Sequence, residues 1–345
     1  MKSYLKMTRE ELLTEKNDLE KEFQKIKELS LDLNLTRGKP SPHQLDLSMG
    51  MYDIISSGSV LRTEAGTDCR NYGSLDGIDE AKRLMAGFMG CREDQVIVHG
   101  NASLSIMYDT IARAMIHGVL GSTPWCRLDK VKFLCPVPGY DRHFAITQYF
   151  GIEMVNIPMT QTGPDMDLVE QLVNEDASVK GIWCVPKYSN PQGITYSDET
   201  VRRFAALKPA ASDFRIYWDN AYAVHDLYED DKDELLSIMQ ECEKAGSQDM
   251  VYEFCSTSKV TFSGAGISAM GLSEKNREDM LKQMSVQTIG HDKIKQWTHT
   301  RYLKNMDGVR AHMAKHAAII RPKFEAVDKI LSREIAPREI GTWIK

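Results

Sequence analysis

The sequence predicts an α/β fold in which a mostly parallel sheet of seven strands is covered by helices and joined to a smaller α/β domain. Between about residues 95 and 275, short apolar runs alternate with helical stretches. The runs up to residue 218 are mostly apolar on both faces, as in parallel strands that lie beneath helices on both sides. A chain of 345 residues is long enough for one large domain and a smaller one.

The individual elements follow from length and periodicity. The predicted strands are 96–99, 131–136, 153–157, 181–185, 215–218, 251–255 and 267–272. Residues 8–30 predict an amphipathic helix, because Thr8 and Glu11 have the spacing of a capping box and an apolar stripe follows. That stripe consists of Leu12, Leu19, Phe23, Ile26 and Leu29. We expect this helix to pack on its own subunit, with a coiled-coil arm as the alternative, and we expect a second long helix at 307–334.

Composition excludes several classes of protein. A formal net charge of −6 disfavours non-specific nucleic-acid binding. No segment has the ~20 consecutive apolar residues of a membrane helix, and the start lacks the apolar run of a signal peptide. The seven cysteines are odd in number and form no C-x-x-C pair, so reduced thiols are expected. These features favour a cytoplasmic protein that binds neither nucleic acid nor membrane.

Polar residues follow three of the predicted strands, at the edge where a ligand of a parallel sheet binds. The segment G-N-A-S-L at 100–104 leads into a helix, and its backbone N–H groups could bind an anion. An ordinary helix cap by Asn101 or Ser103 explains it equally well. Tyr140 lies on a loop rich in Pro and Gly, and Asn190 lies in the turn at 187–193. Either could be no more than turn chemistry.

Two charged residues follow strands that are strongly apolar. Asp219 comes directly after 215–218, and Lys259 comes shortly after 251–255. A buried carboxylate needs a cationic or donor partner, and burial lowers the pKa of a lysine toward its neutral, nucleophilic form. The alternative is a purely structural buried ion pair between them.

Other polar groups give weaker signals. His312 and His316 have the spacing of a metal-binding pair, but no third ligand is in view, so we expect a solvated helix face and no metal. The acidic run at 229–234 predicts an exposed loop or helix start. No role follows from the sequence for His291, His299 or Arg301.

Several motifs together resemble a known family. Y-S-N-P-Q-G, D-N-A-Y and S-T-S-K, in this order, are similar to those of class I aminotransferases, which are pyridoxal phosphate (PLP) enzymes of fold type I. The loops T-R-G-K-P-S-P and R-N-Y-G-S-L-D-G, with G-N-A-S-L and S-T-S-K-V-T-F-S-G-A-G, resemble a bacterial aspartate aminotransferase subgroup. The resemblance covers nearly the whole chain.

The resemblance implies roles for individual residues. Lys259 would bind PLP covalently and carry a proton in catalysis. Asp219 would pair with the pyridinium nitrogen, Asn190 and Tyr222 would donate to the phenolate oxygen, and Tyr140 would stack on the ring. The phosphate would be held by Asn101, Ala102, Ser103, Ser256 and Ser258. Tyr72 would reach the phosphate of the neighbouring subunit in a homodimer, while Gly38, in the loop at 35–42, and Asn190 would line the substrate pocket.

The chain departs from the family pattern at two places. Ile267 stands where many class I enzymes have an arginine for the phosphate. The last residues, G-T-W-I-K, look like a family chain that is cut within the small domain, before the arginine that binds the substrate α-carboxylate. The resemblance implies a large domain at 46–305, which binds PLP. Residues 1–45 and 306–345 then belong to the smaller domain and its connection to the large one. PLP binding is then expected to persist while transamination is weak or absent.

The predicted function is transfer of an amino group from aspartate to 2-oxoglutarate, giving oxaloacetate and glutamate. Other reactions of the fold stay open, namely alanine or aromatic transamination and C–S lysis or β-elimination. The further alternatives are a non-catalytic PLP-binding regulator and an inactive fragment.

Overall fold

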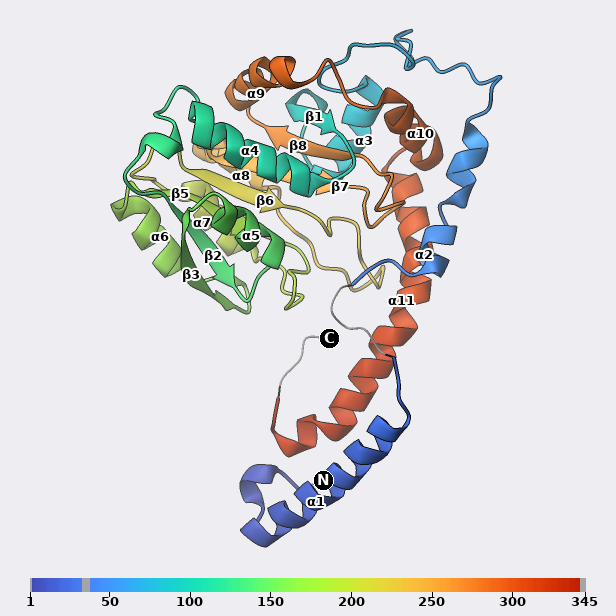
Figure 1. Ribbon diagram of the computed structural model, residues 1–345, viewed down its shortest axis with the longest axis vertical. Helices are drawn as coiled ribbons and strands as arrows, with labels where there is room; N and C mark the ends of the chain where they lie inside the picture. Colours follow the sequence, from blue (N-terminus) through green and yellow to red (C-terminus); the bar gives the residue numbers. More distant parts are fainter. Residues whose placement is uncertain (1, 33–37, 342–345) are drawn as a thin grey trace.

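The computed structural model describes residues 2–32 and 38–341, and it is built around one eight-stranded sheet (Figure 1). The strands are β1 (Val96–His99), β2 (Lys132–Val137), β3 (Glu153–Thr160), β4 (Gly163–Pro164), β5 (Val179–Cys184), β6 (Arg215–Asp219), β7 (Val251–Ser256) and β8 (Ser268–Leu272). Their order across the sheet is β1-β8-β7-β6-β5-β2-β3-β4. The five central strands β7, β6, β5, β2 and β3 are parallel, whereas β8 is antiparallel to both β7 and β1.

All seven predicted strands are present, but the predicted count of seven is wrong. The eighth strand, β4, has only two residues and pairs antiparallel with Met159 and Thr160 at the end of β3. A two-residue strand shows no alternation of apolar and polar positions, so the sequence pattern could not indicate it.

The described part of the chain contains eleven α-helices. They are α1 (Arg9–Glu28), α2 (Pro42–Asp46), α3 (Asp79–Met89), α4 (Ser103–His117), α5 (Asp141–Tyr149), α6 (Met166–Glu175), α7 (Asp198–Ala206), α8 (Ile238–Ala245), α9 (Glu274–Gln287), α10 (Lys293–Leu303) and α11 (Met306–Glu334). The predicted late helix at 307–334 is therefore confirmed as α11. Two short 3-10 helices, η1 (Tyr4–Lys6) and η6 (Ala336–Arg338), lie near the ends.

The sheet is covered on both faces, which makes a three-layer core. Helices α4, α5 and α9 pack on one face, where Phe133, Trp183 and Phe254 are buried. Helices α6, α7 and α8 pack on the other face of the central strands, and α3 and α10 extend this layer over β1 and β8. Successive residues of a strand point to opposite faces, so the central strands must be apolar on both, as the sequence predicted.

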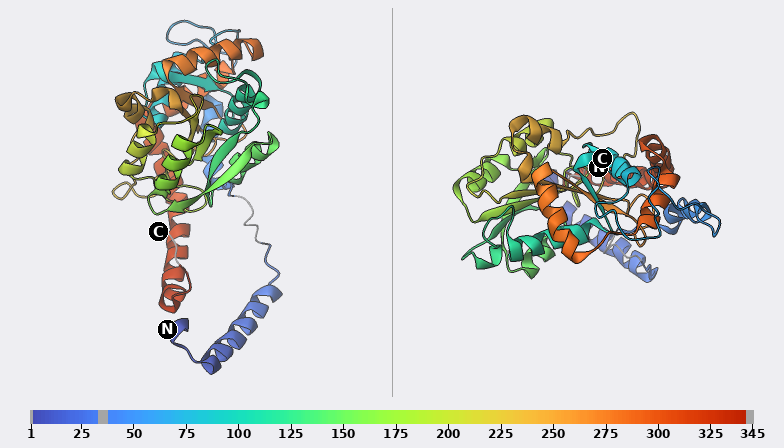
Figure 2. Two further views of the ribbon diagram at one scale, coloured as in Figure 1. Left: turned by 90° about the vertical axis from the view of Figure 1, so that its left-hand side faces the viewer. Right: turned by 90° about the horizontal axis from the view of Figure 1, so that it is seen from above.

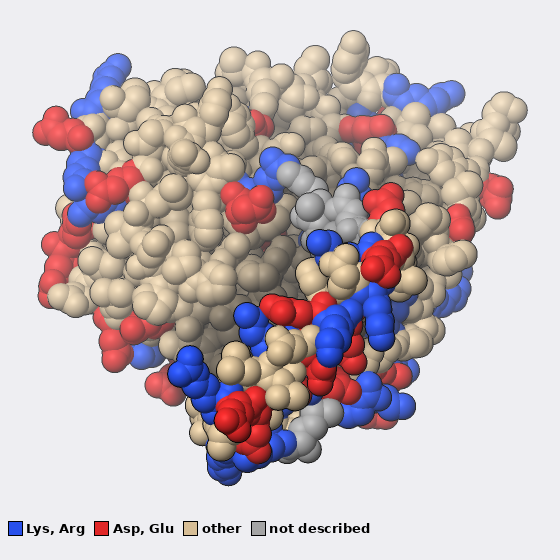
Figure 3. Space-filling model, turned by 60° about the horizontal axis from the view of Figure 1, so that its bottom comes forward, with Lys and Arg blue, Asp and Glu red and all other residues tan. Residues whose placement is uncertain are grey.

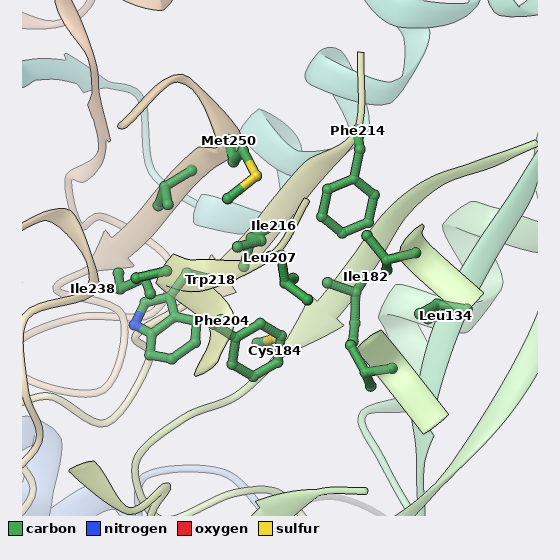
Figure 4. Close-up of a cluster of buried hydrophobic side chains, with 14 of the residues drawn as sticks. Leu134, Ile182, Cys184, Phe204, Leu207, Phe214, Ile216, Trp218, Ile238 and Met250 are labelled. Carbon is green, nitrogen blue, oxygen red and sulfur yellow. The ribbon is translucent and has the colours of Figure 1, made fainter. Parts of the chain in front are cut away.

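Figure 4 shows the core beneath α7. The ring of Phe204 is fully buried and lies edge-to-face against Trp218 of β6, with ring centroids 5.7 Å apart. Ile182 of β5 and Ile216 of β6 complete the contact. Burying side chains of this size contributes about 1.5–3 kcal/mol each, and this packing fixes the strands whose carboxyl ends form the site described below.

A projecting arm extends from the α/β body (Figures 1 and 2). We define the arm as α1, the part of α11 after Pro322, and η6. Arg338 of η6 forms an ion pair with Glu15 of α1, with 2.8 Å between Nη2 and Oε1. Figure 3 shows side chains of both charges mixed over the part of the molecule that comes forward.

The prediction for α1 is only partly confirmed. Thr8 and Glu11 form the predicted capping box. No residue of α1 is buried in the described chain, so the expected packing is limited there to contacts such as the ion pair between Glu15 and Arg338. The apolar stripe is instead exposed, with Phe23 at 63%. An amphipathic pattern specifies that a helix has an apolar face, but it does not specify what covers that face.

Two smaller expectations can be compared with the structure. The acidic run at 229–234 is an exposed loop, as predicted. Within residues 2–32 and 38–341, no helix has the length and apolar character that crossing a membrane requires.

Candidate active site

The predicted site residues gather at the edge where the parallel strands end. Strand β6 ends with Asp219, and its neighbour β7 runs in the same direction, with Phe254 opposite Asp219. The turn that carries Lys259 begins directly after β7. Because both segments leave the sheet at the same edge, residues far apart in the sequence meet there, as the rule for open α/β sheets predicts.

Asp219 is buried, and in the described chain only one of its two carboxylate oxygens has a hydrogen-bond partner. The residue is 3% exposed, and its Oδ2 lies 3.0 Å from Nε2 of His143. Its Oδ1 is also buried but has no hydrogen-bond partner in the described chain. Leaving a buried carboxylate oxygen unpaired is costly. The arrangement therefore suits a ligand that brings an N–H group to Oδ1.

His143 was not among the residues that the sequence indicated. It comes from the first turn of α5, and its ring stacks on Trp183 with centroids 4.6 Å apart and an interplanar angle of 13°. Since the carboxylate of Asp219 accepts, Nε2 of His143 carries the proton. Its position three residues after Tyr140 places both on the same side of the helix start, and this spacing was the available signal.

Lys259 and Tyr222 are in direct contact. The Nζ of Lys259 lies 4.2 Å from the centroid of the Tyr222 ring, a cation–π distance. The pKa of nearby His225 is lowered to about 3, mainly by burial and secondly by the charge of Lys259. The structure therefore places a lysine amine beside the D-N-A-Y turn that also contains Asp219.

Tyr140 and Asn190 line one pocket next to Asp219. The pocket is also lined by Pro136, His143, Trp183 and Ser189. The ring of Tyr140 meets that of His143 edge-to-face at 5.0 Å and 86°. Burial raises the pKa of Tyr140, and the charge of Asp219 raises it further. Tyr140 and Asp219 are thus electrostatic neighbours, in keeping with a flat ligand between these groups.

A second network that the sequence did not indicate ties the loop of Asn190 to the loop of Tyr222. Lys187 and Tyr188 follow β5, and both bond to Oδ1 of Asp226, at 2.7 Å from Nζ and 2.7 Å from the hydroxyl. The side chain of Lys187 is almost fully buried, so its charge requires this partner. The network fixes the two loops relative to each other.

The predicted phosphate residues have different surroundings. Helix α4 begins after Ala102, and no side chain caps it, so the alternative of an ordinary cap by Asn101 or Ser103 is wrong. The side chain of Asn101 is used elsewhere, accepting from the Gly266 N–H at 2.6 Å and donating to the Ser263 carbonyl at 2.9 Å. The uncapped start of α4 is the kind of position where backbone N–H groups bind an anion.

The S-T-S-K turn supplies the remaining predicted phosphate residues. The hydroxyl of Ser256 donates to that of Ser258 at 3.1 Å. Ile267, which stands where many relatives have an arginine, is buried in the core. The predicted phosphate residues of the described chain therefore offer hydroxyl and main-chain groups.

Two predicted residues, Tyr72 and Gly38, lie outside this cluster, and so does Arg301, for which the sequence indicated no role. Tyr72 is 81% exposed, and Gly38 is exposed, with no atom within 4 Å of the place that a β-carbon would occupy. Residues 35–37 of the predicted substrate loop lie outside the described residues. Arg301 is exposed and stacks on Trp297, with its guanidinium carbon 5.3 Å from the ring centroid.

The expectation that His312 and His316 form a solvated helix face is wrong. The two residues are 5% and 1% exposed, because this part of α11 packs against the body and not against solvent. Among the described residues, no group of three or more His, Cys, Asp or Glu is placed to hold a metal ion.

Comparisons with known proteins agree with this geometry. A model of the aspartate amino-transferase family matches residues 7–345. A putative aminotransferase from Mycolicibacterium smegmatis is 44% identical over 343 residues, which are 99% of this chain and 80% of that protein. An aspartate aminotransferase from Corynebacterium glutamicum is 43% identical over 327 residues, 94% of this chain and 75% of that protein.

A solved structure of an aspartate transaminase is also similar to this chain. The crystal structure of an aspartate transaminase from Corynebacterium glutamicum has a TM-score of 0.94 at 42% identity, covering 98% of this chain and 80% of that chain. The expected truncation is not confirmed. The matches extend over almost all of this chain and over 75–80% of the relatives' own lengths. The chain belongs to the aspartate amino-transferase family, and it is a PLP-dependent aminotransferase of fold type I, as its sequence predicted.

Proposed function

We propose that the chain transfers the amino group of aspartate to 2-oxoglutarate, giving oxaloacetate and glutamate, with PLP bound covalently to Lys259. The observation that carries this proposal is the buried, unpartnered Oδ1 of Asp219 at the same sheet edge as the Lys259 amine. The choice of aspartate rests on the 43% identity to an aspartate aminotransferase from Corynebacterium glutamicum.

The residues of the site fit PLP. In this proposal Asp219 accepts a hydrogen bond from the protonated ring nitrogen, which meets the need of its Oδ1. Bound in this way, the cofactor supplies an electron sink for the carbanion formed at the substrate Cα. Asn190 and Tyr222 would hold the phenolate oxygen as donors, and Tyr140 would lie against the ring. Lys259 would move the proton at the substrate Cα.

The phosphate end is assigned to main-chain and hydroxyl groups. We place the phosphate against Ala102 and Ser103 at the uncapped start of α4, where the helix dipole favours an anion. Ser256 and Ser258 add hydroxyl donors. Asn101 supports the site through its bonds to the loop at 263–266, which differs from the direct contact that the sequence suggested.

We further propose a homodimer, in which Tyr72 reaches the phosphate of the neighbouring subunit. The high exposure of Tyr72 in the single chain is compatible with such a role. Gly38 and Asn190 would line the substrate pocket. The proposed domains are 46–305 for PLP binding, and 1–45 with 306–345 for the smaller domain and its connection. All seven cysteines are free thiols, which suits the proposed cytoplasmic location.

Borohydride trapping tests the proposal. The protein is mixed with PLP, reduced and digested, and the modified peptide is identified by mass spectrometry. We expect the label on Lys259, none in Lys259→Ala, and normal labelling in Lys275→Ala, whose side chain is exposed. A panel of amino donors with 2-oxoglutarate then ranks the substrates. Labelling on another lysine would refute the assignment of Lys259, and a stronger response to alanine or phenylalanine would refute aspartate.

A further inference from the structure

Three buried histidines surround the turn that carries Lys259, and none of them has a part in the function proposed above. His299 comes from α10, and His312 and His316 come from α11. All three are at most 5% exposed. Burial lowers the pKa of each, with His299 and His316 at about 4. They are therefore neutral hydrogen-bonding groups near pH 7.

One of these imidazoles, that of His312, bonds to the carbonyl group of Val260. The Nε2 of His312 lies 2.8 Å from the carbonyl oxygen and donates to it. His316 lies directly behind His312, one turn later on α11, with 3.2 Å between the two Nε2 atoms.

The surrounding groups are consistent with a proton on Nε2 of His316. Its other nitrogen, Nδ1, lies 3.4 Å from the amide nitrogen of Gln44, which can only donate. The orientation of that amide is fixed in turn, because its oxygen accepts from the Ser41 N–H at 3.0 Å. Nδ1 of His316 is therefore an acceptor, which leaves the single proton of the neutral ring on Nε2.

The opposite side of the turn is held by His299. Its Nδ1 lies 2.8 Å from the Lys295 carbonyl and so carries the proton. Its Nε2 is then an acceptor for the hydroxyl of Thr261 at 3.0 Å, with that of Thr257 at 3.2 Å. The main chain on both sides of Lys259 is thus fixed by side chains from two helices.

We propose that His312 is a positioning residue for Lys259, which acts by clamping the carbonyl of Val260, and that His316 supports His312 from the next turn of α11. The clamp joins α11 to the residue next to the lysine and holds the main chain so that the amine stays over the Tyr222 ring. This inference rests on the proposed function of Lys259. His312 and His316 touch neither cofactor nor substrate, and they act only through the backbone.

The test compares His312→Leu, which removes the donor, with His312→Gln, which keeps an N–H near the same place. Lys315→Gln, an exposed position on the same turn of α11, is the matched control. For each PLP-loaded enzyme, kcat and KM for the amino donor are measured, together with the rate at which the cofactor-free protein covalently captures added PLP. We expect His312→Leu to lose about tenfold to a hundredfold in both kcat and capture rate, as for a small misplacement of a reacting group. KM should be unchanged, and His312→Gln should recover most of the loss.

The inference is overturned if His312→Leu behaves like Lys315→Gln, or if KM rises with the loss of kcat and glutamine restores nothing. If thermal melting shows that His312→Leu is unfolded, His316→Leu is judged by the same criteria. Imidazole ¹⁵N NMR of the unaltered protein gives an independent answer, since a neutral His312 ring with its proton on Nδ1 and none on Nε2 would contradict the clamp. Failure of the unaltered protein to capture PLP would instead refute the proposed function.

Discussion

The active-site edge of the sheet and the projecting arm use their side chains in opposite ways. At the edge, charged and polar groups are buried and paired, as in Asp219 with His143 and Lys187 with Asp226. On the arm, large apolar side chains are exposed, including Phe23 at 63% and Phe324 at 56%. One region removes polar groups from water, and the other leaves apolar groups in it.

This contrast distinguishes side chains that serve catalysis or ligand binding from side chains that stabilise the fold. Burying a charged group costs free energy unless a partner is supplied, so a buried network with one oxygen left open indicates a ligand. An exposed apolar stripe contributes little to the stability of the chain that carries it. Substitutions at the edge should therefore change activity, substitutions in the core should change stability, and those on the arm should change neither by much.

The largest effect is expected from Asp219. Replacing Asp219 by Ala removes the carboxylate that we assign to the ring nitrogen and should lower kcat by about a thousandfold, the scale seen when a preorganised electrostatic partner is lost. Asp219→Asn keeps the shape of the side chain and removes only its negative charge, so it measures the contribution of the charge alone. Steady-state kinetics with saturating PLP measures both. If Asp219→Asn retained full kcat, the charge of Asp219 would have no role in the reaction.

A matched pair of phenylalanines tests the comparison between core and arm directly. Phe204→Ala empties a fully buried site against Trp218 and should cost about 3–5 kcal/mol of unfolding free energy. Phe23→Ala on α1 makes the same chemical change at an exposed position and should shift stability by no more than about 0.5 kcal/mol. Urea unfolding of both variants gives the difference. A large loss for Phe23→Ala would show that the arm is stabilised by contacts beyond those of the single chain.

The sequence predicted the parts of this molecule that depend on local pattern. The central strands were predicted correctly because strands covered on both faces are apolar throughout. Asp219 and Lys259 were chosen as candidate site residues because charged residues are unusual so soon after such strands. The capping box of Thr8 and Glu11 was found for the same kind of reason, since its two partners are three residues apart.

Contacts between distant segments could not be predicted in this way. The bond from His312 to Val260 joins residues 52 positions apart, and nothing in a two-histidine spacing distinguishes a buried clamp from a solvated face. The role of Asn101 as a tie to the loop at 263–266 is likewise set by tertiary packing. The exposure of the apolar stripe of α1 was not predicted, because the spacing of apolar residues shows that a helix has an apolar face but not what covers that face.

A smaller effect than that of Phe204→Ala is expected from Glu253, which lies in β7 and is 1% exposed. Burial raises its pKa from 4.5 to about 8, although a hydrogen bond from Asn220 acts in the opposite direction. Between these two values the folded protein holds a proton that the unfolded chain has released, so stability must fall as pH rises through this window. The slope from this group is about 1 kcal/mol per pH unit.

Glu253→Gln removes this titration but keeps the shape of the side chain and its contact with Asn220. Urea unfolding at pH 5.5 and pH 7.5, with equal PLP, should show the variant gaining roughly 2 kcal/mol relative to the unaltered protein between the two conditions. The exposed Glu10→Gln on the arm is the control and should show no such gain. Equal pH dependence in all three proteins would mean that Glu253 is charged in the folded state. The buried site would then tolerate a charge without a cationic partner, which would contradict the contrast drawn between the active-site edge and the arm.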